Sequence, residues 1–167
     1  GGTITTPTSP TTTITNIPVG INIFRWTLNN GTCGNSNDLV AIFVFSSTQQ
    51  AANAGADQQI CSSAASVTLA GNSVITPATG TWSQVSGPST LTFSSTTNPT
   101  ATVTGYVPGV YTLQWTINNG PCGSPAILTD QMTLTVYPAS QAAANAGPDQ
   151  SICNTTASVL MAANTAT

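Results

Sequence analysis

The string ANAGADQQIC at residues 52–61 decides the architecture, because it returns almost unchanged as ANAGPDQSIC at residues 144–153. A second string, WTLNNGTCG at residues 26–34, returns as WTINNGPCG at residues 115–123. The copies of the first string lie about 92 residues apart, and those of the second about 89. Self-similarity at a fixed period is the signature of tandem repeats. We therefore expect a structural unit about 90 residues long.

The two spacings also set the expected domain boundaries. We expect residues 1–50 to be the C-terminal part of one repeat, residues 51–140 a complete repeat, and residues 141–167 the N-terminal part of the next. Neither end piece has a counterpart of residues 76–89, which include Trp82. We therefore expect a piece of a longer array. A subunit that completes itself by exchanging strands between chains is the alternative.

Apolar and polar residues alternate along short segments, which is the pattern of β-strands with one buried face. Turn-forming pairs such as Asn98 and Pro99, or Pro108 and Gly109, separate these segments. Many short strands in about 90 residues predict an all-β fold, an antiparallel β-sandwich of the immunoglobulin-like type. In the complete repeat we expect strands near residues 57–60, 66–72, 81–86, 91–93, 100–104, 110–117 and 131–137.

The chain is almost without charge, which excludes several functions. Charged residues make up 3% of the 167 residues, Arg25 is the one basic residue, His is absent and the net charge is −3. A protein without a basic patch is not expected to bind nucleic acid or an anionic membrane surface. No apolar run is long enough to insert into a membrane. Acid–base catalysis usually needs His, Lys or paired carboxylates. The sequence therefore predicts a protein that is not an enzyme and that needs no cofactor.

The complete repeat resembles the PKD-like repeats, in the variant also found in REJ-type regions of extracellular proteins. The resemblance rests on AGADQ (54–58), SVTL (66–69), WSQVSGP (82–88), LTF (91–93), ATVT (101–104) and PGVYTL (108–113). The WDFGDG string of standard PKD domains is missing, so nothing attached to that string is carried over. The resemblance implies tandem immunoglobulin-like, PKD-like sandwiches.

Tandem repeats with paired cysteines and little charge also look similar to those of giant surface adhesins of gliding bacteria. This analogy implies a bacterial cell-surface, extracellular segment with a structural or adhesive role in a long filament or stalk. Its partners would be neighbouring repeats of the same chain, with lateral or end-to-end self-assembly and surface glycans as further candidates. The alternatives are a carbohydrate-binding or spacer module of a secreted enzyme, and a strand-exchanging filament subunit.

The four cysteines, Cys33, Cys61, Cys122 and Cys153, predict structural disulfides in an extracellular chain. Pairing within the repeat would join Cys61 to Cys122. Pairing between neighbours could join Cys33 to Cys61 and Cys122 to Cys153. In a sandwich, the two turns that carry Cys61 and Cys122 lie ~20 Å apart by strand rise, whereas bridged Cα atoms are usually less than about 7 Å apart. Both schemes remain open. Zinc is not expected, because the chain has no C-x-x-C string and no His.

The aspartates are expected to be structural. Asp57 and Asp149 lie in the Gly-x-Asp-Gln strings at the repeat junctions. Calcium would require several oxygen ligands. A single acid at each junction instead favours a carboxylate that accepts backbone hydrogen bonds in a turn, with no metal bound. The same interpretation applies to Asp38 and Asp130, which we expect just before the last strand of each repeat.

The three tryptophans are expected in the core. Trp26 and Trp115 occupy equivalent positions of the repeat, and Trp82 fits the core tryptophan of the third strand. An exposed aromatic strip that stacks on sugars is the alternative. Asn30 and Asn154 match the N-glycosylation pattern, which is a weak signal in a chain rich in Asn and Thr.

Overall fold

The computed structural model describes residues 1–123, 125–156 and 158–165, and these residues form an all-β protein, as predicted. No helix in this part of the chain is long and apolar enough to cross a membrane. Two short 3-10 helices, η1 (Gly31–Cys33) and η2 (Gly120–Cys122), form turns. The strands are β1 (Thr3–Ile4), β2 (Ile14–Thr15), β3 (Gly20–Asn29), β4 (Asn35–Val44), β5 (Gln58–Cys61), β6 (Val67–Thr68), β7 (Thr79–Ser86), β8 (Thr92–Phe93), β9 (Thr102–Thr104), β10 (Gly109–Asn118) and β11 (Ile127–Tyr137).

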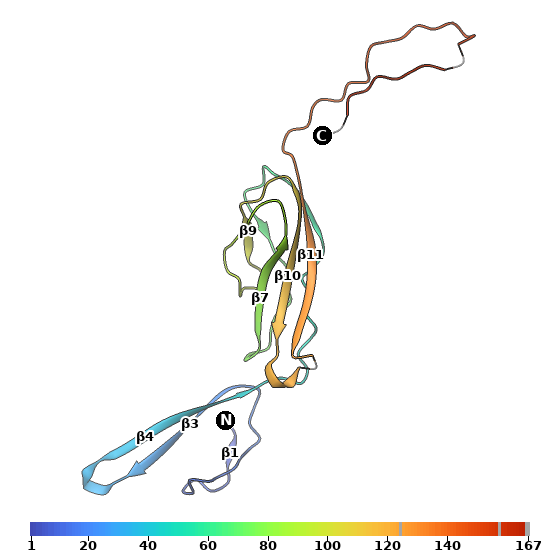
Figure 1. The fold of residues 1–167 in the computed structure, drawn as a ribbon. Helices are drawn as coiled ribbons and strands as arrows, with labels where there is room; N and C mark the ends of the chain where they lie inside the picture. Colours follow the sequence, from blue (N-terminus) through green and yellow to red (C-terminus); the bar gives the residue numbers. More distant parts are fainter. Residues whose placement is uncertain (124, 157, 166–167) are drawn as a thin grey trace.

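A sandwich of two sheets occupies the middle of the molecule (Figure 1). One sheet has the strand order β5-β11-β10-β7, and the other has the order β6-β9-β8. Neighbouring strands are antiparallel except β5, which pairs in parallel with the C-terminal half of β11. This arrangement confirms the expected immunoglobulin-like sandwich, which we call the central domain.

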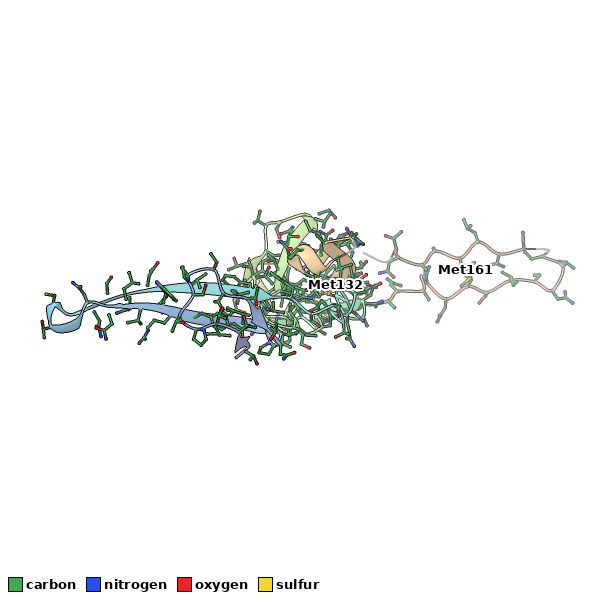
Figure 2. The ribbon with its side chains drawn as sticks, turned by 90° about the horizontal axis from the view of Figure 1, so that it is seen from below. Met132 and Met161 are labelled. Atoms are coloured by element: carbon green, nitrogen blue, oxygen red, sulfur yellow. The ribbon has the colours of Figure 1, made fainter. Side chains whose placement is uncertain are left out.

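The hydrophobic core lies between these two sheets and follows the predicted alternation. Along β10, Tyr111, Leu113, Trp115 and Ile117 are fully buried, while the residues between them are not. The rings of Trp82 and Trp115 meet with their centroids 5.0 Å apart. Figure 2 shows Met132 within the dense central domain and Met161 on a thin segment away from it. The remaining core residues are Ala54, Val67, Leu69, Leu91, Ala101, Val103, Leu134 and Val136.

Two strand boundaries differ from the sequence-based expectation. The strand expected over residues 66–72 is reduced to β6, because the chain beyond it bonds irregularly to residues before β9: the N–H of Leu69 donates to the carbonyl of Ala101 over 2.8 Å. The last strand begins earlier than expected, since β10 and β11 pair from the turn onward. Asp38 and Asp130 therefore lie within β4 and β11, not before them.

The two ends of the chain project from opposite ends of the central domain (Figure 1). At the N-terminal side, β3 and β4 form a long two-stranded hairpin, and β1 and β2 form a short ladder. At the C-terminal side, residues 138–156 and 158–165 form an extended loop without strands.

Candidate functional site

Two aspartates form hydrogen bonds between β11 and the segment that leads into β5. The Asp57 carboxylate, just before β5, accepts the N–H of Thr133 over 2.7 Å. The Asp130 carboxylate in β11 accepts the N–H of Ala54 over 2.8 Å. Both side chains therefore accept backbone hydrogen bonds across the sheet, as a structural role requires, although Asp57 does so between strands and not within a turn. Among the described residues, no three His, Cys, Asp or Glu side chains gather at one point.

The string at residues 82–88 also has a structural role. The Trp82 indole is buried and donates from Nε1 to the carbonyl of Pro99 over 3.2 Å. The Gln84 amide donates to the carbonyl of Ser89 and accepts the N–H of Leu91, which fixes the loop after β7. A Cβ built on Gly87 would lie 2.2 Å from the Tyr111 ring, so a glycine is required there. This string therefore builds the core and a loop, and supplies no reactive group.

The hairpin β3–β4 has the same internal register as β10–β11. Trp26 pairs with Asp38 in the first hairpin, and Trp115 pairs with Asp130 in the second. The β1–β2 ladder likewise reproduces β8–β9, since Thr3 pairs with Thr15 as Thr92 pairs with Thr104. Residues 1–44 therefore adopt the local structure of the C-terminal half of the central domain.

The two hairpins differ in what covers them. Trp115 and Ile117 are fully buried, whereas their counterparts Trp26 and Leu28 are 37% and 56% exposed. Trp26 is thus not buried as expected, because the described residues include no counterparts of β5, β6 and β7 for this hairpin, and only the short β1–β2 ladder and its loop accompany it. Trp82 and Trp115 are buried as expected. We call the surface formed by Phe24, Trp26, Leu28, Val40, Ile42 and Val44 the open half-core. Trp26, Leu28 and Val40 are exposed, and the other three residues are half-buried.

The corner before each hairpin is also similar. The Tyr111 hydroxyl accepts the N–H of Val107 over 2.8 Å and lies 2.7 Å from Ser89 Oγ. This is the tyrosine corner of immunoglobulin-like sandwiches. At the equivalent position the first hairpin has Asn22, whose amide donates to the carbonyl of Pro18 over 2.9 Å. A different side chain therefore closes the same four-residue corner.

The C-terminal loop repeats hydrogen bonds made by the first residues of the central domain. Asn72 Oδ1 accepts the N–H of Asn53 over 2.9 Å, and Asn164 Oδ1 accepts the N–H of Asn145 over 2.8 Å. The Gln58 amide donates to the carbonyl of Thr68, and 92 residues later the Gln150 amide donates to that of Leu160. Without a sheet beside it, this loop leaves apolar side chains exposed, namely Ile152, Leu160 and Met161. Asp149, expected at a junction, is exposed there too.

Residues 45–49 connect the first hairpin to the central domain and pack on its η2 turn; we call this contact the junction. The Asn119 amide donates to the buried carbonyl of Ser46 over 2.9 Å, and the Cys122 thiol lies 3.5 Å from the carbonyl oxygen of Phe45. A Cβ built on Gly120 would lie 2.6 Å from the Phe45 ring, so the ring rests directly on the turn. The Gln49 side chain accepts the N–H of Ile75. The connection is therefore a packed contact.

All four cysteines are exposed free thiols. Cys61 pairs opposite Tyr137 at the C-terminal end of β11, and Cys122 lies just before the N-terminal end of this strand, Ile127. Ten residue steps of a strand separate those ends by roughly 33 Å. A bridge needs Cα atoms less than about 7 Å apart, so the within-repeat pair Cys61–Cys122 cannot form.

The pairs expected between neighbours are also far apart. Cys33 lies at the tip of the β3–β4 hairpin, beyond the junction from Cys61 (Figure 1). Cys122 lies at the junction end of the central domain, whereas Cys153 lies in the loop beyond its other end. Neither Cys33–Cys61 nor Cys122–Cys153 is therefore brought together in this structure.

Sequence reasoning missed the junction residues. Phe45 and Ser46 belonged to no recurring string, Asn119 belonged to one without an assigned role, and their pairing depends on how one segment packs on another. The sequence contained two signals. An aromatic residue occupies equivalent positions at Phe45, after β4, and at Tyr137, the end of β11, and the Asn-Gly turn occurs in both hairpins. The potential glycosylation sites Asn30 and Asn154 are both exposed.

One family model and several solved structures are similar to parts of this chain. Residues 54–136 match the family model described as "K319L-like, PKD domain". No curated protein matches the chain. Among solved structures, the PKD domain from KIAA 1837 protein is 22% identical with a TM-score of 0.44, covering 60% of this chain and 92% of that one. The PKD domain from human KIAA0319 is 20% identical with a TM-score of 0.43, covering 60% and 87%. The endo-fucoidan hydrolase MfFcnA4 is 17% identical with a TM-score of 0.36, covering 72% of this chain and 19% of the hydrolase.

Proposed function

We propose that residues 54–136, which form a PKD-like domain of the immunoglobulin type, are one unit in an end-to-end series of such domains. PKD-like domains are typically non-catalytic adhesive or spacer modules of extracellular or cell-surface proteins. In the proposed series, residues 1–50 end one unit, residues 51–140 form the next, and residues 141–167 begin a third. The series forms the stalk or filament of a surface protein, of the kind found in the adhesins of gliding bacteria.

The open half-core carries this proposal. Its side chains stand in the same register as buried core residues 89 positions later for β3 and 92 positions later for β4, and burying a large apolar side chain is worth about 1.5–3 kcal/mol. Exposed surfaces of this kind usually have a partner. The occupant that fits is a segment with the chemistry of residues 51–89, since in the central domain those residues supply β5 and β7 at the two edges of the sheet and β6 of the facing sheet. The packed junction supports a fixed end-to-end arrangement.

Lateral association has support of its own. The opposite face of β3–β4 exposes Ile21, Ile23, Leu39 and Phe43, and it would stay exposed after the half-core is covered. The equivalent face of the central domain has Val110, Thr112, Gln131 and Thr135. Weak charge repulsion, with 3% charged residues, favours contact between neighbouring stalks.

A carbohydrate-binding module is the second candidate, because Trp26 is exposed beside Arg25 and Asn29 around a shallow hollow. Trp26 belongs to the open half-core, however, and the end-to-end series would bury it. Sugar binding that survives covering of the half-core would favour this second candidate.

An extended chain, in which a copy of residues 51–89 precedes Gly1, tests the proposed function. The copied segment should complete the first unit, so the dye anilinonaphthalene sulfonate, which binds exposed apolar surface, should bind the extended chain far less than the original. A chain preceded by the same 39 residues in scrambled order is the matched control. Unchanged dye binding by a monomeric extended chain would overturn the proposal. A stable dimer of the original chain with its half-core covered would favour strand exchange between copies.

A further inference from the structure

We infer that the cysteines form a disulfide across each junction, joining the Cys61 position of one unit to the Cys122 position of the next. The inference rests on the proposed end-to-end series. It assigns each of the four thiols a partner on an adjoining unit, which explains why no two of them are neighbours in this chain.

Cys122 lies at the junction. The Cys122 thiol of the central domain lies 3.5 Å from the carbonyl oxygen of Phe45, which belongs to the preceding unit. Cys122 also borders a hollow at the junction, together with Ser47, Gln49 and Asn119. The thiol is exposed and therefore open to an incoming group.

Cys61 lies at the other end of the central domain. Tyr137, 92 residues after Phe45, occupies the equivalent position, and Cys61 is its partner in the parallel ladder of β5 and β11. The N–H of Ser62 donates to the Tyr137 carbonyl over 2.7 Å, which fixes this register. Neighbouring strands lie about 4.8 Å apart, so a cysteine stands beside the last aromatic residue of a complete unit.

In the proposed series, both cysteine positions adjoin a single residue, Phe45. A preceding unit with its first strand in place would set its own cysteine beside Phe45, as Cys61 stands beside Tyr137. Cys122 already contacts Phe45 from the other side of the junction. A disulfide requires Cα atoms about 4.4–6.8 Å apart, so the inferred bond places both cysteines on the same side of Phe45.

The chemistry of the bond is ordinary thiol–disulfide exchange. Two thiols lose two protons and two electrons as the S–S bond forms. An external disulfide, such as oxidised glutathione or a disulfide-carrying oxidoreductase, accepts both electrons and leaves as two thiols. Extracellular conditions preserve such bonds.

The extended chain tests the inference. After oxidation with glutathione buffer, alkylation and peptide mass spectrometry should find one disulfide per monomer, between the copied cysteine and Cys122, with three thiols alkylated. The original chain should keep four thiols. In the extended chain, Cys122→Ser should remove the bond and Cys33→Ser should leave it intact. If the extended chain no longer binds the dye but Cys122 remains a free thiol, the disulfide inference alone is overturned. If the extended chain still binds the dye, the result counts against the end-to-end series itself.

A second measurement needs no folding of an added segment. A peptide copying residues 54–63, with its cysteine as the glutathione mixed disulfide, should pair along the free edge of β4 in the original chain. Its cysteine should then transfer to Cys122 on the order of tenfold faster than to Cys33, because pairing raises its local concentration. A peptide with Ile60→Pro, which cannot pair as a strand, should show no preference. Equal labelling of both cysteines by the first peptide would contradict the inference.

Discussion

The hairpins β3–β4 and β10–β11 share their register and a 3-10 turn, yet one is partly open to solvent and the other is the centre of a core. Hydrogen bonding between their strands is the same, so local pairing alone sets the shape of both hairpins. Trp115 is buried and Trp26 is not, because strands from elsewhere in the chain pack on β10–β11. The comparison separates what a hairpin specifies by itself from what its partner sheet adds. Matched substitutions in the two hairpins can measure this difference.

The tryptophans should show the largest contrast. Trp115→Ala removes a fully buried side chain and should lower the free energy of unfolding of the central domain by about 3–5 kcal/mol, because it leaves a cavity. Trp26→Ala should change it by less than about 0.5 kcal/mol in the original chain. Urea unfolding followed by circular dichroism measures both. In the extended chain, Trp26→Ala should become as costly as Trp115→Ala; equal costs in the original chain would refute the comparison.

The aspartates should differ by a smaller amount. Asp130→Ala leaves the N–H of buried Ala54 without an acceptor, which should cost about 2 kcal/mol. Asp38→Ala should cost almost nothing, because Asp38 is exposed. Urea midpoints of the two variants provide the test. A loss at Asp38 that matches the loss at Asp130 would show that the first hairpin is already covered in solution.

Substitutions of Gly120, in the turn at the junction, and of Gly31, in the exposed turn of the first hairpin, should have different effects. Gly120 and Gly31 both have positive φ, at 53° and 60°, so alanine strains each backbone. At Gly120 the added methyl group also meets the Phe45 ring, whereas it would meet open space at Gly31. Gly120→Ala should therefore destabilise the central domain by about 1.5 kcal/mol and speed proteolysis of residues 45–51. Gly31→Ala should leave both unchanged; if Gly120→Ala does not alter proteolysis, the junction is not packed in solution.

The corner residues should show the smallest effect. Tyr111→Phe removes the hydroxyl that accepts from Val107 and should cost about 1 kcal/mol in urea unfolding. Asn22→Ala should leave the midpoint of the central domain unchanged and instead speed amide hydrogen exchange near residues 18–22. An unchanged midpoint for Tyr111→Phe would mean that the corner contributes nothing to the stability of the sandwich.

The sequence predicted the fold better than the sites. Alternation placed β7, β10 and β11 within a few residues, because each is long and has one buried face. The segment after β6 was expected to be a longer strand than it is, since alternation does not show where a strand's partner ends. Two nearly identical strings 92 residues apart predicted the repeat, and the recurrence of the Asn53 and Asn145 hydrogen bonds agrees with that local similarity.

The cysteines show why the remainder could not be predicted. Their number and spacing indicate disulfides but do not give the partners, because connectivity depends on which ends of two sheets meet. Only the parallel register of Cys61 with Tyr137 and the contact of Cys122 with Phe45 place each thiol at a particular end. Similarly, Asp130 could not be paired with Ala54 from the sequence, because 76 residues separate them.

The parallel pairing of β5 with β11 has a mechanical consequence. The chain enters the central domain at the junction, runs through residues 50–57 to β5, and leaves the domain after Tyr137 at the opposite end. Tension between these two points therefore pulls β5 and β11 along their own axes in opposite directions. The ladder from Gln58 to Cys61 is loaded in shear, so its hydrogen bonds must break together and cannot open one after another. A stalk built from such domains would lengthen abruptly, one domain at a time, and only above a threshold tension.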